Sequence, residues 1–342
     1  MSSNPPAFVS RVYAMNTCEP AQIMVVKPGW FTTVQDLGRY GYQQYGVPVS
    51  GAMDRRSFII ANRLVGNRDH DAALEITLKG PELLFETDSI IAVTGADLTP
   101  SVNGTVIPLW SSLLMKAGSV LSFGARRAGA RCYVAIAGGV DVPVVLGSRS
   151  THSSSQTGGV KGRALVQGDV LVSGTPLPHA QTTVGRGLPD RLRPIYSSTT
   201  TLRLLPGPQR DSFSNDSVTV LTTHPYRLSS QSDRIGYRLE GPKLAHVEAG
   251  EWISDGTAMG ALQVPHDGQP ILLMADRQTT GGYPKIAVVI SADLHLAGQL
   301  MPGDMIIFGM TTLPEAQAIL KAQWEEVNRT IPLYRELSAE NG

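Results

Sequence analysis

The chain has 342 residues, of which 42% are hydrophobic and 17% are charged, and its 29 Lys and Arg residues balance its 29 Asp and Glu residues. This composition excludes an intrinsically disordered chain, and a net charge of zero removes the attraction that nucleic acid or an anionic membrane surface would need. No run of about 18 apolar residues occurs, so no membrane span is expected, and the length suits two hydrophobic cores.

Residues 1–22 are expected to form a flexible N-terminal extension. They lack the uninterrupted apolar stretch of a signal peptide, which favours a cytoplasmic protein. Two cysteines, Cys18 and Cys132, are too few for a disulfide framework or a cysteine zinc site. Because Cys132 lies in an apolar run, we expect it in the core.

Short runs rich in Val, Ile, Leu and Thr dominate the chain, and 35 glycines and 23 prolines separate them. This pattern predicts many short β-strands joined by turns. Examples are residues 89–98, 131–140, 201–208 and 285–294. The predicted fold class is therefore mostly β.

Two segments instead show helical spacing of apolar residues. Residues 53–66 have Asp54 as a plausible cap and Gly66 as a stop. Residues 311–330 have Thr312 as the expected cap, with a proline in the first turn. The fold should thus contain few helices, one of them near the C-terminus.

The strands are expected to group into two related units. A segment rich in Pro, Gly, Ser and Thr, residues 176–200, predicts a linker between an N-terminal β-unit (23–175) and a C-terminal β-unit (201–310), followed by a helix and tail (311–342). Three motifs recur in the same order in both units: QDLGRYGYQ with QSDRIGYRL, KGPELLF with EGPKLAH, and AGSVLSFG with PGDMIIFG. Repeated turn–strand patterns favour barrels or sandwiches.

The stretch from Asp276 to Lys285 holds more hydrogen-bonding groups than a hairpin turn requires. Arg277 and Lys285 offer cations to a carboxylate or phosphate. Asp276 could orient Arg277, hold a magnesium-bound phosphate or act as a base. Further binding groups are expected from Gln278, Thr279, Thr280, Gly281, Gly282 and Tyr283, the two glycines offering backbone amides to an oxyanion. The alternative is an elaborate turn whose polar groups satisfy one another.

A second polar cluster spans residues 230–238, where the candidate binding residues are Gln231, Ser232, Asp233, Arg234 and Tyr237. A solvated start of a strand is the alternative. Arg149, next to glycine and serine, could contact an anion or only form a turn. No phosphate-binding GxxxxGK[ST] loop and no HExxH motif occurs, the seven histidines are scattered, and no metal site is predicted.

Long motifs between residues 23 and 310 resemble one family, the biotin-dependent carboxyltransferase-type family. It is also called the allophanate hydrolase subunit 2 family or the family of the 5-oxoprolinase C subunit, and it is related to urea amidolyase. The motifs include VVKPGWFTTVQDLGRYGYQQYGVPVSGAMD, ALEITLKGPELLFE, GGVDVPVVLGSRST, QSDRIGYRLEGP and LLMADRQTTGGYPKIAVVISADL. The resemblance implies a pair of cyclophilin-like β-barrel units. The chain departs from the family at residues 152–157, which puts the choice of substrate in doubt more than the fold.

The resemblance implies the C-type subunit of an ATP-dependent 5-oxoprolinase that opens 5-oxoproline to glutamate, with ATP and Mg²⁺ as cofactors. The implied partners are a subunit-1-type protein, which is B-like in 5-oxoprolinase terms, and an A-like protein, without which the chain is expected to be inactive. Asp276, Arg277 and Lys285 are the predicted catalytic residues. The alternatives are a carboxyltransferase that uses carboxybiotin from a separate protein on urea or another amide, and a non-enzymatic regulatory partner.

Overall fold

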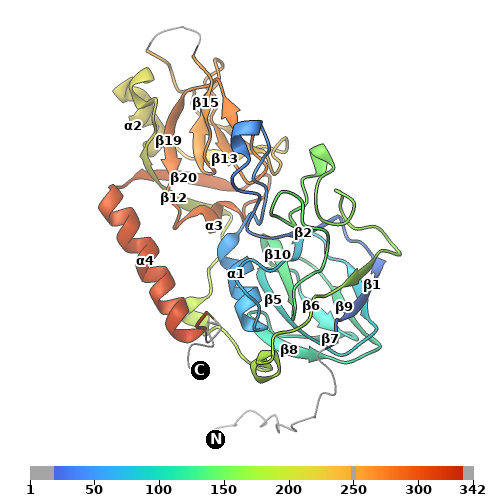
Figure 1. Ribbon diagram of the computed structural model, residues 1–342. Helices are drawn as coiled ribbons and strands as arrows, with labels where there is room; N and C mark the ends of the chain where they lie inside the picture. The colour runs from blue at the N-terminus through green and yellow to red at the C-terminus, as the bar shows by residue number, and fades with distance from the viewer. Residues whose placement is uncertain (1–18, 248–251, 334–342) are drawn as a thin grey trace, which may run out of the picture.

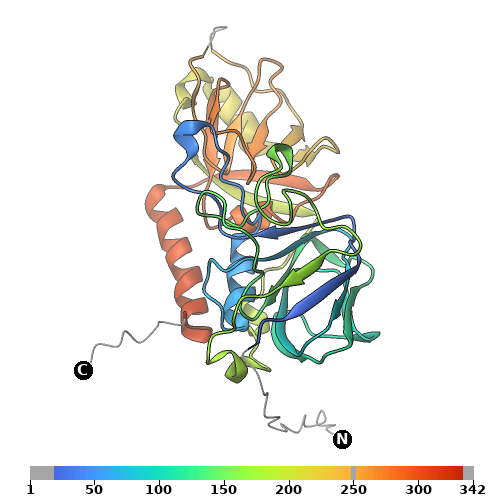
Figure 2. The same cartoon turned by 45° about the vertical axis from the view of Figure 1, so that its right-hand side comes forward.

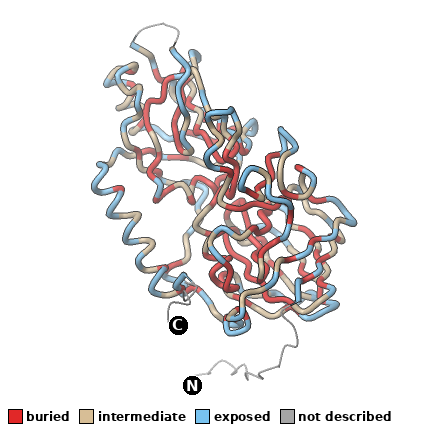
Figure 3. Tube along the Cα trace, in the orientation of Figure 1, coloured by how far each residue is buried: buried red, intermediate tan, exposed pale blue. Residues whose placement is uncertain are grey.

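The computed structural model describes residues 19–247 and 252–333, so Cys18 and most of the predicted N-terminal extension lie outside the described residues. The chain forms two β-units, one above the other in Figure 1, with helices α1 and α4 beside them. The mostly β fold class is therefore confirmed. Figure 3 shows buried segments running through both units and across the junction between them.

The first unit consists of two sheets that enclose a hydrophobic core, which includes Ile23, Leu74 and Val134. One sheet has the strand order β11-β1-β4-β9-β6-β7 and the other β2-β3-β10-β5-β8. The strands are β1 (Gln22–Lys27), β2 (Phe31–Gln35), β3 (Ala73–Thr77), β4 (Glu82–Phe85), β5 (Ser89–Asp97), β6 (Pro100–Val102), β7 (Thr105–Val106), β8 (Ser111–Met115), β9 (Ser119–Phe123), β10 (Ala128–Ile136) and β11 (Val170–Val172). Cys132 is buried in this core, as predicted, and burial raises the pKa of its thiol.

The second unit is a closed barrel with the strand order β12-β19-β16-β17-β14-β13-β20. Strands β12 and β20 pair in parallel, and the other pairs in the barrel are antiparallel. The strands are β12 (Thr199–Pro206), β13 (Tyr226–Leu228), β14 (Gly236–Glu240), β16 (Ala261–Gln263), β17 (Ile271–Leu273), β19 (Lys285–Val289) and β20 (Met305–Met310), with a small ribbon of β15 (Asp255–Gly256) and β18 (Thr280–Gly281) beside them.

The described residues contain four α-helices: α1 (Arg55–Leu64), α2 (Asn215–Thr223), α3 (Leu294–Ala297) and α4 (Leu313–Thr330). The predicted caps are confirmed. Asp54 accepts a hydrogen bond from the Ser57 amide, and Thr312 forms a reciprocal capping box with Glu315. None of these helices is long and apolar enough to traverse a lipid bilayer.

The repeated turn–strand motifs share one backbone conformation. Gly118 and Gly303, in the paired motifs AGSVLSFG and PGDMIIFG, have φ values of 81° and 96°, and Gly168, in the similar stretch QGDVLVSG, has a φ of 85°. The three glycines lie one or two residues before β9, β20 and β11, respectively. A residue with a β-carbon would be strained at this φ. The sequence repeat therefore encodes the same turn three times.

Helix α4 connects the two units, as both ribbon views show (Figures 1 and 2). Its residue Ala316 packs with Ile290 and Ala292 of the second unit, and its residue Val327 packs in a core cluster of the first. The segment predicted as a linker contributes buried residues, Leu188 and Leu192, to the same cluster. Between these contacts, Leu320, Gln323 and Trp324 of α4 line a hollow.

We expect Thr312→Ala to destabilise the protein by about 0.5–2 kcal/mol, because the Glu315 amide loses its side-chain acceptor. Urea denaturation followed by circular dichroism measures this change. The control is Thr105→Ala in the exposed strand β7, which should alter stability by less than about 0.5 kcal/mol. Equal effects of the two substitutions would contradict the role of the cap.

Candidate functional site

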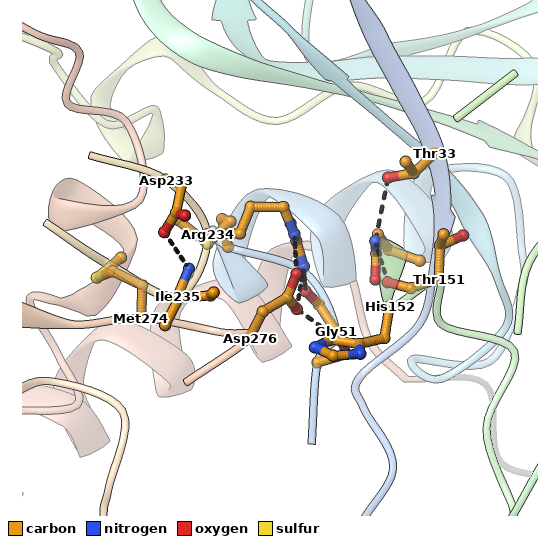
Figure 4. A network of polar contacts seen from close by, with 12 residues as sticks. Thr33, Gly51, Thr151, His152, Asp233, Arg234, Ile235, Met274 and Asp276 are labelled. Atoms are coloured by element: carbon orange, nitrogen blue, oxygen red, sulfur yellow. Dashed lines mark hydrogen bonds and ion pairs between the residues drawn. The ribbon is translucent and has the colours of Figure 1, made fainter. Parts of the chain in front are cut away.

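Arg234 occupies the junction between the two units and is 9% exposed. Its Nε donates to Asp276 at 2.8 Å and its Nη2 to the carbonyl of Gly51 at 2.7 Å (Figure 4). Its Nη1 donates to Glu75 on β3. Burial lowers the pKa of Arg234, but the carboxylates of Asp276 and Glu75 more than offset this effect, so the pKa is raised. The guanidinium is thus a permanent charge with partners from both units.

Both carboxylates that face Arg234 have further donors. Ser50 donates to Asp276 at 2.7 Å, whereas Glu75 accepts from the Met53 amide at 2.8 Å and from the Tyr133 hydroxyl at 2.7 Å. Buried charges are tolerated only when they are paired and hydrogen-bonded in this way. The sequence-predicted Asp276 therefore orients Arg234 rather than Arg277.

A second set of buried hydrogen bonds links the two units next to this network. Gln299 donates to Asp54 and to the Arg131 carbonyl, both at 2.8 Å, and accepts from the amides of Ala130 and Arg131. The Nη1 of Arg131 in turn donates to the Gly298 carbonyl at 2.8 Å. Gln299 and Gly298 belong to the second unit. These bonds therefore hold the second unit in a fixed position against strand β10 of the first unit.

A cleft of about 300 Å³ opens between the two units beside this network. The second unit contributes Ser232, Asp233, Arg234, Ile235 and Asp276, and the first contributes Phe31, Thr77, Arg131, Ser153 and Ser154. We call it the inter-unit cleft. Four sequence-predicted residues line it: Ser232, Asp233, Arg234 and Asp276. It offers hydroxyls and guanidinium groups to a small polar ligand.

A neighbouring pocket of about 270 Å³ lies on the barrel and shares Asp233 and Ile235 with the inter-unit cleft. Four sequence-predicted residues line it: Gln231, Asp233, Gln278 and Tyr283. Asp233 shapes the wall between the two hollows, because its carboxylate accepts the amides of Ile235 and Gly236 at 2.8 and 3.2 Å. The two polar clusters of the sequence therefore meet in space.

The polar stretch after β17 is only partly a turn whose polar groups form hydrogen bonds with one another. Thr280 and Gly281 form the short strand β18, which pairs with Asp255 and Gly256. A β-carbon on Gly281 would approach the Gln263 side-chain nitrogen to 2.4 Å, so a larger residue there would push the Gln263 side chain aside. Thr279 and Gly282 lie next to this ribbon and are partly exposed.

The two predicted catalytic cations do not line either hollow. Lys285 is buried, with its Nζ 3.7 Å from Asp255. Within the described residues, the Arg277 side chain forms two long hydrogen bonds of 3.4 Å, to the carbonyls of Thr257 and Met274. Burial lowers the pKa of Arg277, Arg55 acts in the same direction, and Tyr40 opposes the shift. The catalytic role of Arg277 and Lys285 stays a prediction.

Tyr237 and Arg149 also lie outside both hollows. Tyr237 is 1% exposed in the barrel core, with the Arg131 guanidinium 5.8 Å from its ring centre. The Arg149 amide donates to Asp36 at 2.6 Å, and its side chain contacts the Val142 carbonyl and Asp141. Both residues support structure around the site.

His152 is a site residue that the sequence did not single out. It is 7% exposed, and its Nδ1 lies 2.7 Å from the Ser155 hydroxyl. Its ring lies near Asp276, close enough for the two groups to interact electrostatically (Figure 4). Burial lowers the pKa of His152, the positive charges of Arg234 and Arg39 add to this effect, and Asp276 opposes it. A neutral imidazole at pH 7 beside a carboxylate could accept or donate a proton.

Within residues 19–247 and 252–333, no group of three or more His, Cys, Asp or Glu side chains is arranged to hold a metal ion. Asp233 and Asp276, the carboxylates that line the inter-unit cleft, accept the hydrogen bonds described above. Magnesium with ATP therefore stays an expectation from the sequence.

Comparison with known proteins gives one family. The model of the carboxyltransferase domain, subdomain A and B, matches residues 45–310. The 5-oxoprolinase C subunit of Escherichia coli (strain K12) is 40% identical over 304 residues, which are 89% of this chain and 95% of that protein. The urea amidolyase of Saccharomyces cerevisiae is 35% identical over 89% of this chain but only 17% of its own length. The crystal structure of the K. lactis urea amidolyase covers 95% of this chain and 21% of its own, with a TM-score of 0.84 and 34% identity.

Replacing Arg234 by methionine should destabilise the protein by about 3–5 kcal/mol, because the carboxylates of Glu75 and Asp276 lose their buried counter-charge. Chemical denaturation measures the loss. Arg227→Met is the matched control: Arg227 pairs with Glu240 at 2.6 Å on the surface, and removing it should cost far less. Similar small losses in both variants would show that the junction does not depend on Arg234.

His152 should make the protein less stable in acid. Its pKa in the folded protein lies below the ordinary value of about 6.5, so the unfolded chain binds the proton more readily and stability falls as the pH drops below that value. In His152→Gln, the loss of unfolding free energy between pH 7.5 and pH 5 should be smaller than in the wild type. The exposed residue His70, replaced in the same way, is the control, and an unchanged pH profile in His152→Gln would refute the prediction.

Proposed function

The chain belongs to the family of carboxyltransferase domains of the subdomain A and B type, and on this premise we propose that it is the C-type subunit of an ATP-dependent 5-oxoprolinase. The observation that supports this proposal most strongly is the 40% identity to the E. coli 5-oxoprolinase C subunit over 95% of that protein's length. The chain would therefore act together with B-like and A-like partner proteins.

In the proposed reaction, the lactam oxygen of 5-oxoproline takes the terminal phosphoryl group of Mg²⁺-ATP, with release of ADP. Water then adds to the activated carbon, the ring C–N bond breaks and phosphate leaves, which yields glutamate. Such chemistry needs cations near the phosphoryl group and donors on the lactam oxygen. The inter-unit cleft supports it with Arg131 and the hydroxyls of Ser153 and Ser232.

Arg131 is the best-placed group for the substrate carboxylate. It lines the cleft, and it forms no ion pair within 4.0 Å in the part of the chain that the structure describes. Arg234 lines the same cleft, but its charge is already matched by Asp276 and Glu75. We therefore assign substrate binding to Arg131 and positioning to Arg234.

A carboxyltransferase is the second candidate, and the similarity to the K. lactis urea amidolyase along 95% of the chain favours it. In that case the donor would be carboxybiotin on a separate carrier protein, and the same cleft would bind urea or another small amide. The matched part of that enzyme is only 21% of its length, and the carrier would be supplied from outside the matched part.

Reconstitution separates the two candidates. The purified chain with its B-like and A-like partners should release phosphate from ATP only when 5-oxoproline is present, and none of the three proteins should do so alone. Liquid chromatography of glutamate and a coupled phosphate assay measure both products. Carboxylation of urea with a biotinylated carrier, without turnover of 5-oxoproline, would favour the second candidate instead.

In that assay, Arg131→Gln should raise the KM for 5-oxoproline by about tenfold or more, with a smaller change in kcat, because a charge-assisted contact to the carboxylate is lost. Arg126→Gln, an exposed residue near the start of β10, is the matched control. The double variant Arg277→Ala, Lys285→Ala tests the sequence prediction separately. Full turnover in it would remove both residues from the catalytic site.

A further inference from the structure

A third hollow, of about 260 Å³, lies under helix α4 and shares no lining residue with the inter-unit cleft. We call it the α4 cleft. Its walls come from three elements and the loops beside them: α1, α3 and α4. The lining residues are Met53, Arg55, Arg56, Ile59, Met259, Ser291, Leu294, His295, Leu320, Gln323 and Trp324.

Two arginines line this cleft without a carboxylate partner. In residues 19–247 and 252–333, neither Arg55 nor Arg56 has an ion pair within 4.0 Å. Arg55 donates to the Leu37 carbonyl at 3.2 Å and to the Tyr40 hydroxyl, and Arg56 donates to the Leu192 carbonyl at 3.0 Å. The Nε of each arginine is buried without a hydrogen-bond partner. Both guanidinium groups therefore lack a direct ion-pair partner among the described residues, and the more distant carboxylates that act on Arg56 are those of Asp54 and Glu326.

The nearby carboxylates are already in use. Asp54 accepts from Ser57 and Gln299, and Glu326 pairs with Arg191 on the surface. A third cation adds to the positive field, because Arg277 lies close enough to Arg55 for the two charges to interact. Like charges this close are costly unless an anion balances them.

The rest of the cleft is largely apolar. Ile59, Leu294, Leu320 and the partly exposed ring of Trp324 surround the space, and the polar groups beside the arginines are those of Ser291, His295 and Gln323. A volume of about 260 Å³ is slightly below the usual ligand-pocket range of about 300–1,000 Å³. The occupant must therefore be small, with an apolar body and one negative group.

From this arrangement we propose that the α4 cleft is a binding site for a small aromatic or branched aliphatic carboxylate. The carboxylate is held by Arg55 and Arg56, and the apolar body packs against Leu294, Leu320 and Trp324. The site is distinct from the proposed substrate cleft, so it does not depend on the 5-oxoprolinase proposal.

Isothermal titration calorimetry of the full chain with 3-phenylpropionate tests the proposal. The neutral, equally shaped 3-phenylpropionamide should bind at least tenfold more weakly, because it cannot neutralise the guanidinium groups. This comparison uses only the wild-type protein and is independent of any folding defect in a variant. Absence of binding by the acid, or equal affinity of acid and amide, would overturn the proposal.

Variants then locate the bound acid. Arg56→Gln should weaken binding at least tenfold, whereas Arg329→Gln on the exposed part of α4 should leave it unchanged. Binding should also change tryptophan fluorescence, and Trp324→Phe should abolish that change. Equal binding by the two arginine variants, or a fluorescence change that persists in Trp324→Phe, would place the ligand elsewhere and refute the assignment.

Discussion

The burial of one guanidinium, that of Arg234, constrains the relation between the two β-units. Its partners are Asp276 in the second unit and Glu75 and Gly51 in the first. A buried charge that loses a partner costs several kcal/mol, so the units cannot rotate apart while the protein stays folded. The hydrogen bonds of Gln299 to the first unit add a second connection between the two units. The walls of the inter-unit cleft are therefore held in a fixed geometry before any ligand arrives.

This constraint explains the polar stretch that follows β17. Its first residue, Asp276, belongs to the junction, whereas Gln278 and Tyr283 line the pocket on the barrel. One segment thus connects the buried ion pairs at the junction of the two units to the pocket on the barrel. A site that needs walls from both units also accounts for the extent of the family match, which runs from residue 45 in the first unit to residue 310 in the second.

Local features of the fold could be predicted from the sequence because local physics determines them. The caps Asp54 and Thr312 and the repeated glycine turns need only their neighbours along the chain. The partnership of Arg234 with Glu75 joins residues 159 positions apart, and no spacing rule encodes it. A lone glutamate within the buried strand ALEIT was the available signal, since such a charge requires a partner. His152 lies in the segment 152–157 that departs from the family pattern, but its place beside charged groups could not be predicted, because those groups come from three distant segments.

The segment from Ser50 to Asp54 relates the two clefts. Ser50 and Gly51 bind Asp276 and Arg234, and the amides of Met53 and Asp54 bind Glu75 and Tyr133. Met53 also lines the α4 cleft, and Asp54 caps the helix that bears Arg55 and Arg56. A ligand shifts an equilibrium only when it binds two conformations differently. Because hydrogen bonds at all five of its residues, including that of the Ala52 amide to the Asp36 carbonyl at 2.9 Å, hold this segment in one conformation, it acts as a rigid support on which each cleft binds its own ligand.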